Sequence, residues 1–430
     1  MSNAYAGIDF GTTNTTAAVA GGGMAPHIVP IENNDVATPS AIFFEEKTGR
    51  VFFGRAAMQK YMNADPGRFM RSLKRVLGTN LMMTGTIING RPWTFQDILG
   101  TFMENVKARL DAAAGQSIEH VVMGRPVHFR DNDPTGDALA EKELEQIAKK
   151  SGFKEVLFQY EPIAGALAHE QLLREEMLAA VIDIGGGTSD FSIIRLGGDR
   201  AGKADRKDDI LANTGVRIGG NDFDKRLSLE SFMQEFGKGV EYNSGTEKQP
   251  KLLPIPTTYF FDLSEWSHVN SLYTHKNINM VNKYWKWSGN NERLGRLVEV
   301  LEHELGHKVL AMVEDTKISL TDLETLDVLL NFLSSKTKIP VTRKEFERAI
   351  APQAVKILDS VNECARLSGV KFTDVQLIVL TGGSTEIPYI RDTLCRLFPN
   401  AKVSSGEKLS SVGLGLAFDA IRRFEKNSGR

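Results

Sequence analysis

The sequence predicts an α/β protein built from two related halves, on the basis of three observations. The chain has 430 residues, which at roughly 150 residues per domain corresponds to two or three domains. A strand–turn–strand pattern with glycine and threonine in the turn occurs twice, at residues 5–19 and 180–196. A strand, a double glycine and a helix follow one another at residues 375–397. Mixed sheets with flanking helices accommodate all three patterns.

The first copy of the hairpin pattern lies at the start of the chain. An apolar stretch at residues 5–10 contains Asp9, and a second apolar stretch follows at residues 17–19. The turn between them consists of Gly11, Thr12, Thr13 and Asn14. Neither stretch has a helical period, so both are predicted as strands.

The second copy repeats this order. Residues 180–184 are apolar around Asp183, and residues 191–196 form the second predicted strand. The turn consists of Gly185, Gly186, Gly187 and Thr188. One glycine hairpin of this kind is common, but two matched hairpins, one in each half, favour a shared function over coincidence.

The position of the glycines indicates the chemistry. In a P-loop or a dinucleotide-binding fold the glycine loop joins a strand to a helix, whereas here it joins two strands. Glycine lets backbone N–H groups approach phosphate oxygens, and Thr12, Thr13 and Thr188 can add hydroxyl donors. A carboxylate beside a polyphosphate needs a cation between them, and Mg²⁺ held through waters by Asp9 and Asp183 fits this need.

The third segment has a different geometry. Residues 375–380 are predicted as a strand, and Ile387, Ile390 and Leu394 follow at helical spacing. The turn between them contains Gly382, Gly383 and Ser384. A helix N-terminus after a double glycine can face a ribose or a phosphate, although many α/β folds contain such a turn.

Composition is that of an ordinary globular protein. The chain is 41% hydrophobic and 25% charged, and its net charge of -2 gives no indication of nucleic acid or of an acidic membrane surface as a partner. The two cysteines, Cys364 and Cys395, do not make a disulfide framework and fit a reducing compartment. We therefore expect a cytoplasmic protein with no membrane segment.

The three glycine segments together resemble the heat-shock protein 70 (DnaK-type) family of the actin/hexokinase superfamily. Their order is that of the family, and the resemblance covers nearly the whole chain. It implies a two-lobed actin-like ATPase fold, a duplicated ribonuclease H-like architecture in which each lobe is a mixed sheet with flanking helices. It also implies ATP or ADP with Mg²⁺, with the hairpins on the phosphates and the third segment on the adenosine.

Further segments favour the chaperone branch of the superfamily. Residues 69–78 resemble the segment of the family's catalytic lysine, which assigns that role to Lys74. Taken without the resemblance, Lys74 beside Arg71 and Arg75 is also explained as a solvated basic face. The catalytic set that the resemblance implies is Lys74, Glu161, Asp183, Thr188 and Asp9.

Three more segments carry the same resemblance. Residues 159–167 resemble the family's Glu-Pro helix start, where Glu161 precedes Pro162. Residues 121–129 resemble the first connection between the lobes. Residues 217–224 resemble a glycine turn of the family, which makes Gly219 and Gly220 candidate nucleotide-binding residues.

A pair on one predicted helix completes the adenosine side. A helix from about residue 293 to residue 320 places Glu314 and Lys317 on one face, where the alternative is a surface ion pair. The family has Glu and Lys at this spacing. Two departures concern the strength of binding: Ile318 stands where the family commonly has a second basic residue, and Ser410 where it often has Asp.

The resemblance also predicts how the chain is divided. The predicted parts are lobe I at residues 1–178 with an outer subdomain at about 38–117, lobe II at 179–404 with an outer subdomain at about 227–345, and a C-terminal helix at 405–430 that returns to lobe I. We expect no peptide-binding domain, so that any partner binds the lobes themselves.

An aromatic region lies in the outer part of predicted lobe II. Trp266 and Trp285 belong to it, and it resembles the YegD-like branch of bacterial chaperone relatives. These aromatic side chains either fill the core of the subdomain or form a surface for a protein partner around Trp266 and Trp285.

One motif points to different chemistry. Residues 303–307 match the His-Glu-x-x-His pattern of zinc proteases, and a continuous helix would place His303 and His307 on one face. A match of five residues is weak, no third ligand is evident, and we expect no zinc site.

The function predicted from these features is an ATP-binding and ATP-hydrolysing chaperone-like protein with Mg-dependent ATPase activity. Two alternatives stay open. A small-molecule kinase of the same fold would share both hairpins but needs a pocket for an acceptor hydroxyl. A nucleotide-gated binding module would close on ATP without hydrolysing it.

Overall fold

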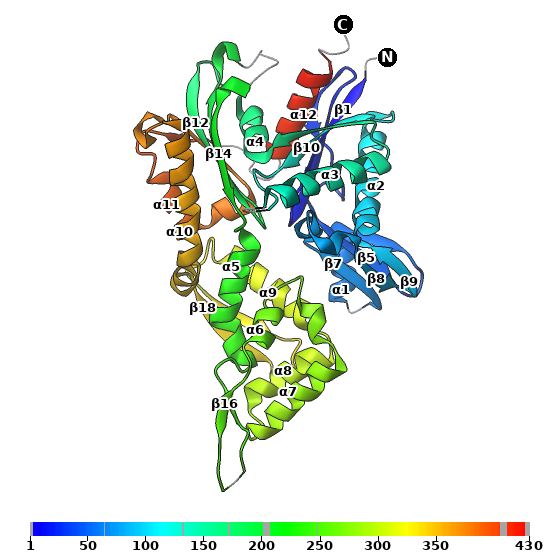
Figure 1. The fold of residues 1–430 in the computed structure, drawn as a ribbon, viewed down its shortest axis with the longest axis vertical. Helices are drawn as coiled ribbons and strands as arrows, with labels where there is room; N and C mark the ends of the chain where they lie inside the picture. Colours follow the sequence, from blue (N-terminus) through cyan, green and yellow to red (C-terminus); the bar gives the residue numbers. More distant parts are fainter. Residues whose placement is uncertain are drawn as a thin grey trace. The chain divides into compact units, whose positions relative to one another are not determined.

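The computed structural model describes residues 3–63, 65–130, 133–170, 173–200, 207–246, 248–404 and 411–425. The chain divides into two compact units, drawn in Figure 1. Unit 1 comprises Met1–Gly220, Lys356–Glu386 and Ile390–Arg430, and unit 2 comprises Asn221–Val355 and Ile387–Tyr389. Among the described residues, no helix combines the length and the hydrophobicity that a membrane span requires.

The first sheet of unit 1 contains the first predicted hairpin. Its strands are β1 (Ala4–Phe10), β2 (Asn14–Gly21), β3 (Met24–Ile28), β10 (His120–Arg125) and β11 (Glu155–Tyr160), in the order β11-β10-β1-β2-β3, and β4 (Thr38–Pro39) pairs with β2. Strands β1, β2 and β3 are antiparallel neighbours, whereas β10 is parallel to β1 and β11 is parallel to β10.

The second sheet of unit 1 has the same topology around the second hairpin. Its strands are β12 (Met177–Ile184), β13 (Ser189–Leu196), β14 (Ile210–Val216), β19 (Leu377–Thr381) and β20 (Lys402–Val403), in the order β14-β13-β12-β19-β20. Again three antiparallel strands are followed by two parallel ones. The internal repeat that the sequence predicts is therefore a repeated sheet, and each hairpin consists of its first two strands.

Each sheet is followed by a helix that packs on the other sheet. Helix α4 (Glu161–Glu170) follows β11 and packs on β12, β13 and β19. Helix α12 (Ser411–Phe424) follows β20 and packs on β1, β2 and β10, as Figure 1 shows. The two helices also pack on each other. The repeats have thus exchanged their last helices, and neither sheet is covered by its own chain segment alone.

Glycines make this close packing possible. A Cβ atom on Gly413 would lie 2.4 Å from Oγ1 of Thr16, on β2. A Cβ atom on Gly415 would lie 1.7 Å from the carbonyl oxygen of Ala164, on α4. Because these distances are far shorter than any real contact, helix α12 can lie where it does only without side chains at these two positions.

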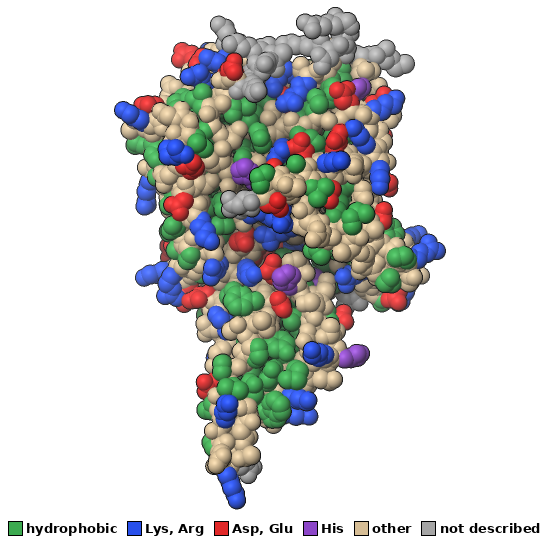
Figure 2. Space-filling model, in the orientation of Figure 1, with side chains coloured by type: hydrophobic (Ala, Val, Ile, Leu, Met, Phe, Trp, Pro, Cys, Tyr) green, Lys and Arg blue, Asp and Glu red, His purple; other side chains and the backbone are tan. Residues whose placement is uncertain are grey.

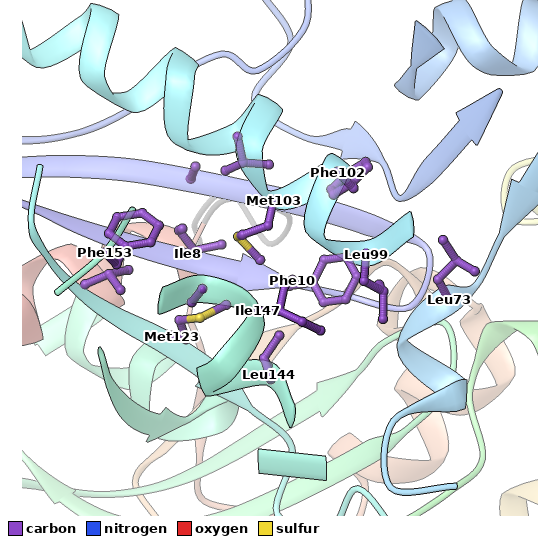
Figure 3. Close-up of a cluster of buried hydrophobic side chains, with 14 of the residues drawn as sticks. Ile8, Phe10, Leu73, Leu99, Phe102, Met103, Met123, Leu144, Ile147 and Phe153 are labelled. Carbon is purple, nitrogen blue, oxygen red and sulfur yellow. The ribbon is translucent and has the colours of Figure 1, made fainter. Parts of the chain in front are cut away.

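Helices α2 (Phe95–Ala114) and α3 (Pro134–Lys150) cover the other side of the first sheet. Figure 3 shows their apolar side chains meeting those of β1 and β10. The buried residues labelled there include Ile8, Phe10, Leu99, Phe102, Met103, Met123, Leu144, Ile147 and Phe153. Burial of each such side chain contributes about 1.5–3 kcal/mol, which holds β1 and its Asp9-bearing end rigidly in place.

A small sheet extends this first half. Its strands are β5 (Ala41–Glu45), β6 (Val51–Phe53) and β7 (Gly67–Arg71), with α1 (Gly54–Met62) beside them and the hairpin β8 (Gly85–Ile88) and β9 (Arg91–Thr94) further along the chain. Strand β7 leads directly into a 3-10 helix at Leu73–Val76 that contains Lys74.

The remaining helices of the second half are α10 (Arg343–Ser368) and α11 (Pro388–Cys395). Helix α11 links the parallel strands β19 and β20, as α3 links β10 and β11. The strand, glycine turn and helix that the sequence predicts at residues 375–397 are therefore present.

Unit 2 is mostly helical. Its elements are α5 (Gly220–Leu227), β15 (Glu241–Asn243), β16 (Leu252–Pro254), α6 (Thr258–Leu263), α7 (His275–Trp287), α8 (Glu292–Glu302), α9 (Gly306–Ser319), β17 (Thr325–Leu330) and β18 (Thr337–Thr342). Strands β15 and β16 form a hairpin with α7 beside it (Figure 1).

The prediction of a single helix from residue 293 to residue 320 is wrong, because two helices occupy this range. Helix α8 ends at Glu302 and α9 begins at Gly306, because Glu304 has a left-handed backbone with φ of 53°. The break accommodates the preceding segment: a Cβ atom on Gly306 would lie 2.4 Å from Val269, and the Gly306 N–H donates to the Tyr273 hydroxyl at 3.0 Å. His303 and His307 therefore do not share a continuous helix, and His307 is buried against Trp266.

The exchanged helix α12 provides a matched test. Gly415→Ala should lower the free energy of unfolding by about 1–3 kcal/mol, because the methyl group overlaps the backbone of α4. Gly100→Ala, inside α2, meets no atom within 4 Å and should raise it by about 0.5–1 kcal/mol. Thermal unfolding followed by circular dichroism should show shifts of opposite sign, and equal shifts would contradict the packing described.

Candidate functional site

The turns of the two hairpins lie directly against each other in unit 1. A Cβ atom on Gly187 would lie 2.7 Å from Oγ1 of Thr12, and one on Gly186 would lie 1.6 Å from Oγ1 of Thr13. The glycines therefore allow the approach of the second turn to the first. The two turns, at residues 11–14 and 185–188, are far apart in the sequence, and the repeated sheets bring them together.

A pocket opens at these turns. Its lining includes the predicted residues Asp9, Gly11, Thr12, Thr13, Asn14, Lys74, Glu161, Asp183, Gly185, Gly186, Gly187, Thr188, Gly382 and Gly383, together with Thr16 and Val412. The structure thus gathers both hairpins, the third glycine segment, Lys74 and Glu161 around one cavity.

Lys74 and Glu161 form a buried ion pair at the pocket. The Lys74 Nζ donates to Glu161 Oε1 at 2.6 Å, and the two side chains are only 7% and 8% exposed. The burial of Lys74 therefore excludes the alternative explanation, in which this lysine belongs to a solvated basic face.

The two residues of this pair come from segments that are distant in the sequence. Lys74 lies in the 3-10 helix after β7, whose entry needs the left-handed conformation of Ser72, with φ of 60°. After the 3-10 helix, the N–H of Gly78 donates to Glu143 of α3 at 2.7 Å. This hydrogen bond fixes the Lys74 segment to a helix that packs on the first sheet. Glu161 is the first residue of α4, so its carboxylate lies at the junction of the two repeats.

The buried carboxylates of Glu161, Asp183 and Asp190 and the half-buried carboxylate of Asp9 lie around the Lys74 ammonium group. Burial and the charge of Glu161 raise the pKa of Asp9 well above its usual value, and the same two causes raise the pKa of Asp183 and of Asp190 to about 8. Burial alone would lower the pKa of Lys74, but the Glu161 and Asp9 carboxylates more than offset it, so the pKa is raised. The site therefore contains more acidic groups than one lysine can keep ionised.

This excess fits a bound cation. One carboxylate oxygen, Asp190 Oδ2, is buried without a hydrogen-bond partner among the described residues. No group of three or more His, Cys, Asp or Glu in the described part of the chain is placed to hold a metal directly. Carboxylates that cannot all reach one ion suit Mg²⁺, which keeps several of its waters.

Asp190 was missing from the residues predicted for the site. It is the direct cross-strand partner of Asp183 in the hairpin formed by β12 and β13, and its Oδ1 accepts the N–H of Val127 at 2.7 Å. The available signal was a second Asp at the start of the returning strand. Its inward direction follows from its pairing with Asp183, which depends on the length of the turn.

The remaining predicted glycines support the pocket from behind. Gly220 N donates to the Gly185 carbonyl at 2.9 Å, and a Cβ atom on Gly219 would lie 2.6 Å from Gly187 N. These two residues therefore back the second turn without lining the pocket. Gly382 has φ of 77° and lies against Asp183, and the Ser384 hydroxyl donates to the Gly185 carbonyl at 3.2 Å.

The predicted adenosine pair lies on α9 of unit 2. Lys317 Nζ is 2.8 Å from the carboxylate of Asp224 on α5, so the lysine has a buried acidic partner within its own unit. Ile318 is 58% exposed. Glu314 lies one turn before Lys317 on α9, and Ser410 lies outside the described residues. The contact of Glu314 and Lys317 with adenosine stays a prediction.

The two tryptophans named for a partner surface both face inward. Trp266 is 9% exposed and packs against His307. The Trp285 ring lies 3.4 Å from where a Cβ atom of Gly295 would be, and so packs on α8. Trp287, two residues further along α7, is 46% exposed. Among the described aromatic residues of this region, the exposed ones are therefore Trp287 on α7 and Phe261 on α6, which is 44% exposed.

Comparison with known families agrees with this geometry. A family model described as Hsp70 protein matches residues 5–84, 80–253 and 291–421. The matched segments cover most of the chain and contain every predicted site residue. Residues 254–290, which include α6 and α7, lie between the matched segments.

Because acidic groups outnumber the lysine in the site, we predict that removing the charge of Lys74 and removing the charge of Glu161 have different effects on stability. Lys74→Met should lower the free energy of unfolding by up to about 3–5 kcal/mol, because it leaves only buried carboxylates. Glu161→Gln should be neutral or stabilising, because Lys74 keeps the other carboxylates as partners. Calorimetry without nucleotide or divalent ions checks this, and a larger loss in Glu161→Gln would show that the remaining carboxylates do not stabilise Lys74.

Proposed function

Because the chain belongs to the Hsp70 family and therefore has the two-lobed actin-like ATPase fold, we propose that it binds and hydrolyses ATP as a chaperone-like protein. Membership of the family supports an ATP-binding, chaperone-like function. That this chain hydrolyses the ATP is our proposal. The YegD-like branch, the cytoplasmic location and the lobe boundaries at residues 178 and 404 remain predictions.

The observation that carries the proposal is the buried Lys74–Glu161 pair at the apposed hairpin turns. Phosphoryl transfer to water requires mainly the positioning of the nucleophile and the neutralisation of charge on the phosphates. A lysine and a carboxylate fixed beside a turn rich in backbone N–H groups supply both. In this assignment Lys74 positions the attacking water, and Glu161 helps to orient it or accepts its proton.

The hairpin turns form the proposed phosphate site. Backbone N–H groups of the glycines, with the hydroxyl groups of Thr12, Thr13 and Thr188, would bind the phosphate oxygens, with Thr188 at the γ-phosphate. On the adenosine side we assign Gly382, Gly383 and Ser384, together with Glu314 and Lys317. Gly219 and Gly220 would act by holding the second turn in place.

Asp9 and Asp183 are the proposed holders of the magnesium waters, with Asp190 beside them. Bound Mg²⁺ would supply positive charge for the phosphates and restore the ionised form of carboxylates whose pKa values are raised by burial. The chain's own contribution is to hold Asp9 and Asp183 in the lining of the pocket, with Asp190 buried on the strand beside Asp183.

Lys74→Ala tests the catalytic assignment. Single-turnover hydrolysis of ATP with magnesium should fall by at least about 100-fold, the scale of loss for one removed electrostatic group, while ATP binding persists. Lys107→Ala is the matched control, because Lys107 is also buried and pairs with Asp111 away from the pocket. Equal turnover in wild type and Lys74→Ala would remove Lys74 from the mechanism.

The same assay separates the alternative functions. Tight ATP binding with no hydrolysis in the wild type would favour the nucleotide-gated module. Phosphate transfer only when a sugar or a carboxylic acid is added would favour the kinase. Phosphate release with water alone supports the proposed ATPase.

Asp9→Asn tests the magnesium assignment. The substitution keeps the shape of the side chain but removes one charge, so the magnesium concentration needed for half-maximal ATP binding should rise about tenfold or more. Titration calorimetry of ATP at several magnesium concentrations measures it. An unchanged magnesium dependence would contradict a role for Asp9 at the cation.

A further inference from the structure

Residues 254–290 form a firmly packed part of unit 2 that the family model does not match. Within it, the Tyr273 hydroxyl accepts the N–H of Gly306 at 3.0 Å, and Trp285 of α7 packs on Gly295 of α8. Val281 and Tyr284 are the buried side chains of α7. One side of α7 is thus fixed to the unit, and its other side faces solvent.

The solvent side of α7 has a single sign of charge. Lys276, Lys283 and Lys286 are exposed, and the helix contains no Asp or Glu. None of the three lysines forms an ion pair with any described residue. Lys276, Lys283 and Trp287 are spaced by seven and four positions, so they follow one stripe along the helix.

Trp287 is exposed but held in place. Its ring stacks on Tyr242 of β15 with centroids 5.8 Å apart and an interplanar angle of 26°. The Tyr242 ring in turn packs on the ring of the buried Tyr284, with centroids 4.7 Å apart. A large aromatic side chain with little freedom to lose is the type of residue that anchors protein interfaces.

Hydrophobic side chains gather on this part of unit 2. On the face drawn in Figure 2 they lie over the region where Figure 1 draws α6 and α8, with Lys and Arg side chains at their margin. Leu252, Phe261 and Trp287 are 60%, 44% and 46% exposed. An aromatic centre with a basic margin is complementary to a partner that presents apolar and acidic side chains together.

From these contacts we propose that the solvent face of α7, with Lys276, Lys283, Lys286 and Trp287, together with Tyr242 of β15, binds an acidic segment of a partner protein. The inference goes beyond the proposed ATP hydrolysis, and it moves the partner surface expected around Trp266 and Trp285 to the exposed side of α7. An apolar or aromatic side chain of the segment packs on Trp287 and Tyr242, and its carboxylates pair with the lysines.

The same face is poorly suited to the other polyanions. A helix that lies in a membrane surface needs a continuous apolar face toward the lipid, whereas the apolar face of α7 is turned into unit 2. Single-stranded nucleic acid binds to rows of exposed rings. Among Tyr284, Trp285 and Trp287 of α7, only Trp287 is exposed, since Tyr284 is buried and Trp285 is half-buried.

A peptide-display selection on the full chain tests the proposal. A random dodecapeptide library is selected on the wild type and, in parallel, on Lys283→Glu/Lys286→Glu. We expect peptides rich in Asp and Glu with one or two large apolar residues on the wild type, and their loss, with enrichment of Lys and Arg, on the variant. Failure to enrich acidic peptides on the wild type would contradict the proposal.

Fluorescence anisotropy with the selected peptide then locates the site. Lys283→Glu/Lys286→Glu and Trp287→Ala should each weaken binding by at least about tenfold. Lys371→Glu/Lys402→Glu, which makes the same change of charge at exposed lysines of unit 1, should weaken it less than twofold. Equal weakening by both charge-reversal pairs would indicate general electrostatic attraction and overturn the assignment to α7.

Two further probes and one activity separate the remaining outcomes. Binding of phosphatidylserine vesicles or of a 30-nucleotide single-stranded RNA that depends on Lys283 and Trp287, without peptide binding, would assign the face to a membrane or to RNA. ATP turnover should be unchanged in all α7 variants. No ATP turnover in the wild type with intact peptide binding would leave the α7 inference standing by itself, and ATP turnover without peptide binding would leave the ATPase standing by itself.

Discussion

The buried contact between Lys74 and Glu161 is the constraint on which the site depends. Two opposite charges removed from water are stable only if their geometry is good and their remaining hydrogen-bonding capacity is used. Here the lysine comes from the segment after β7 and the glutamate from the first turn of α4, 87 positions later. The pair therefore requires both segments to be in place, and the surrounding carboxylates bind their protons until another cation shares their charge.

Much of the fold could be predicted from the sequence because its signals are local. Alternation of apolar residues, a glycine turn and a second strand are readable within fifteen residues, and both hairpins have the predicted strands. The gathering of Asp9, Asp183 and the turn residues in one pocket follows from repeating the same sheet. The contact of Lys74 with Glu161 is not local, and the family resemblance indicated only that both residues belong to the catalytic set.

The features that were missed depend on contacts between distant segments. The pattern of residues 293–320 is helical throughout, and the break at Gly306 arises because Val269 and Tyr273 occupy the space beside it. Likewise, composition predicts an aromatic region but not its direction. Trp285 and Trp287 are two positions apart on one helix, so that one packs on α8 and the other meets solvent.

The exchange of α4 and α12 has a consequence for how unit 1 could be divided. A cut between the repeats would leave each piece with the helix that the other piece needs, and each sheet with one bare apolar face. Such fragments would be expected to recombine with each other, or with second copies of themselves, before either became a stable domain. The duplication has produced two interdependent halves, and a partner or a mutation that loosens one helix acts on both sheets at once.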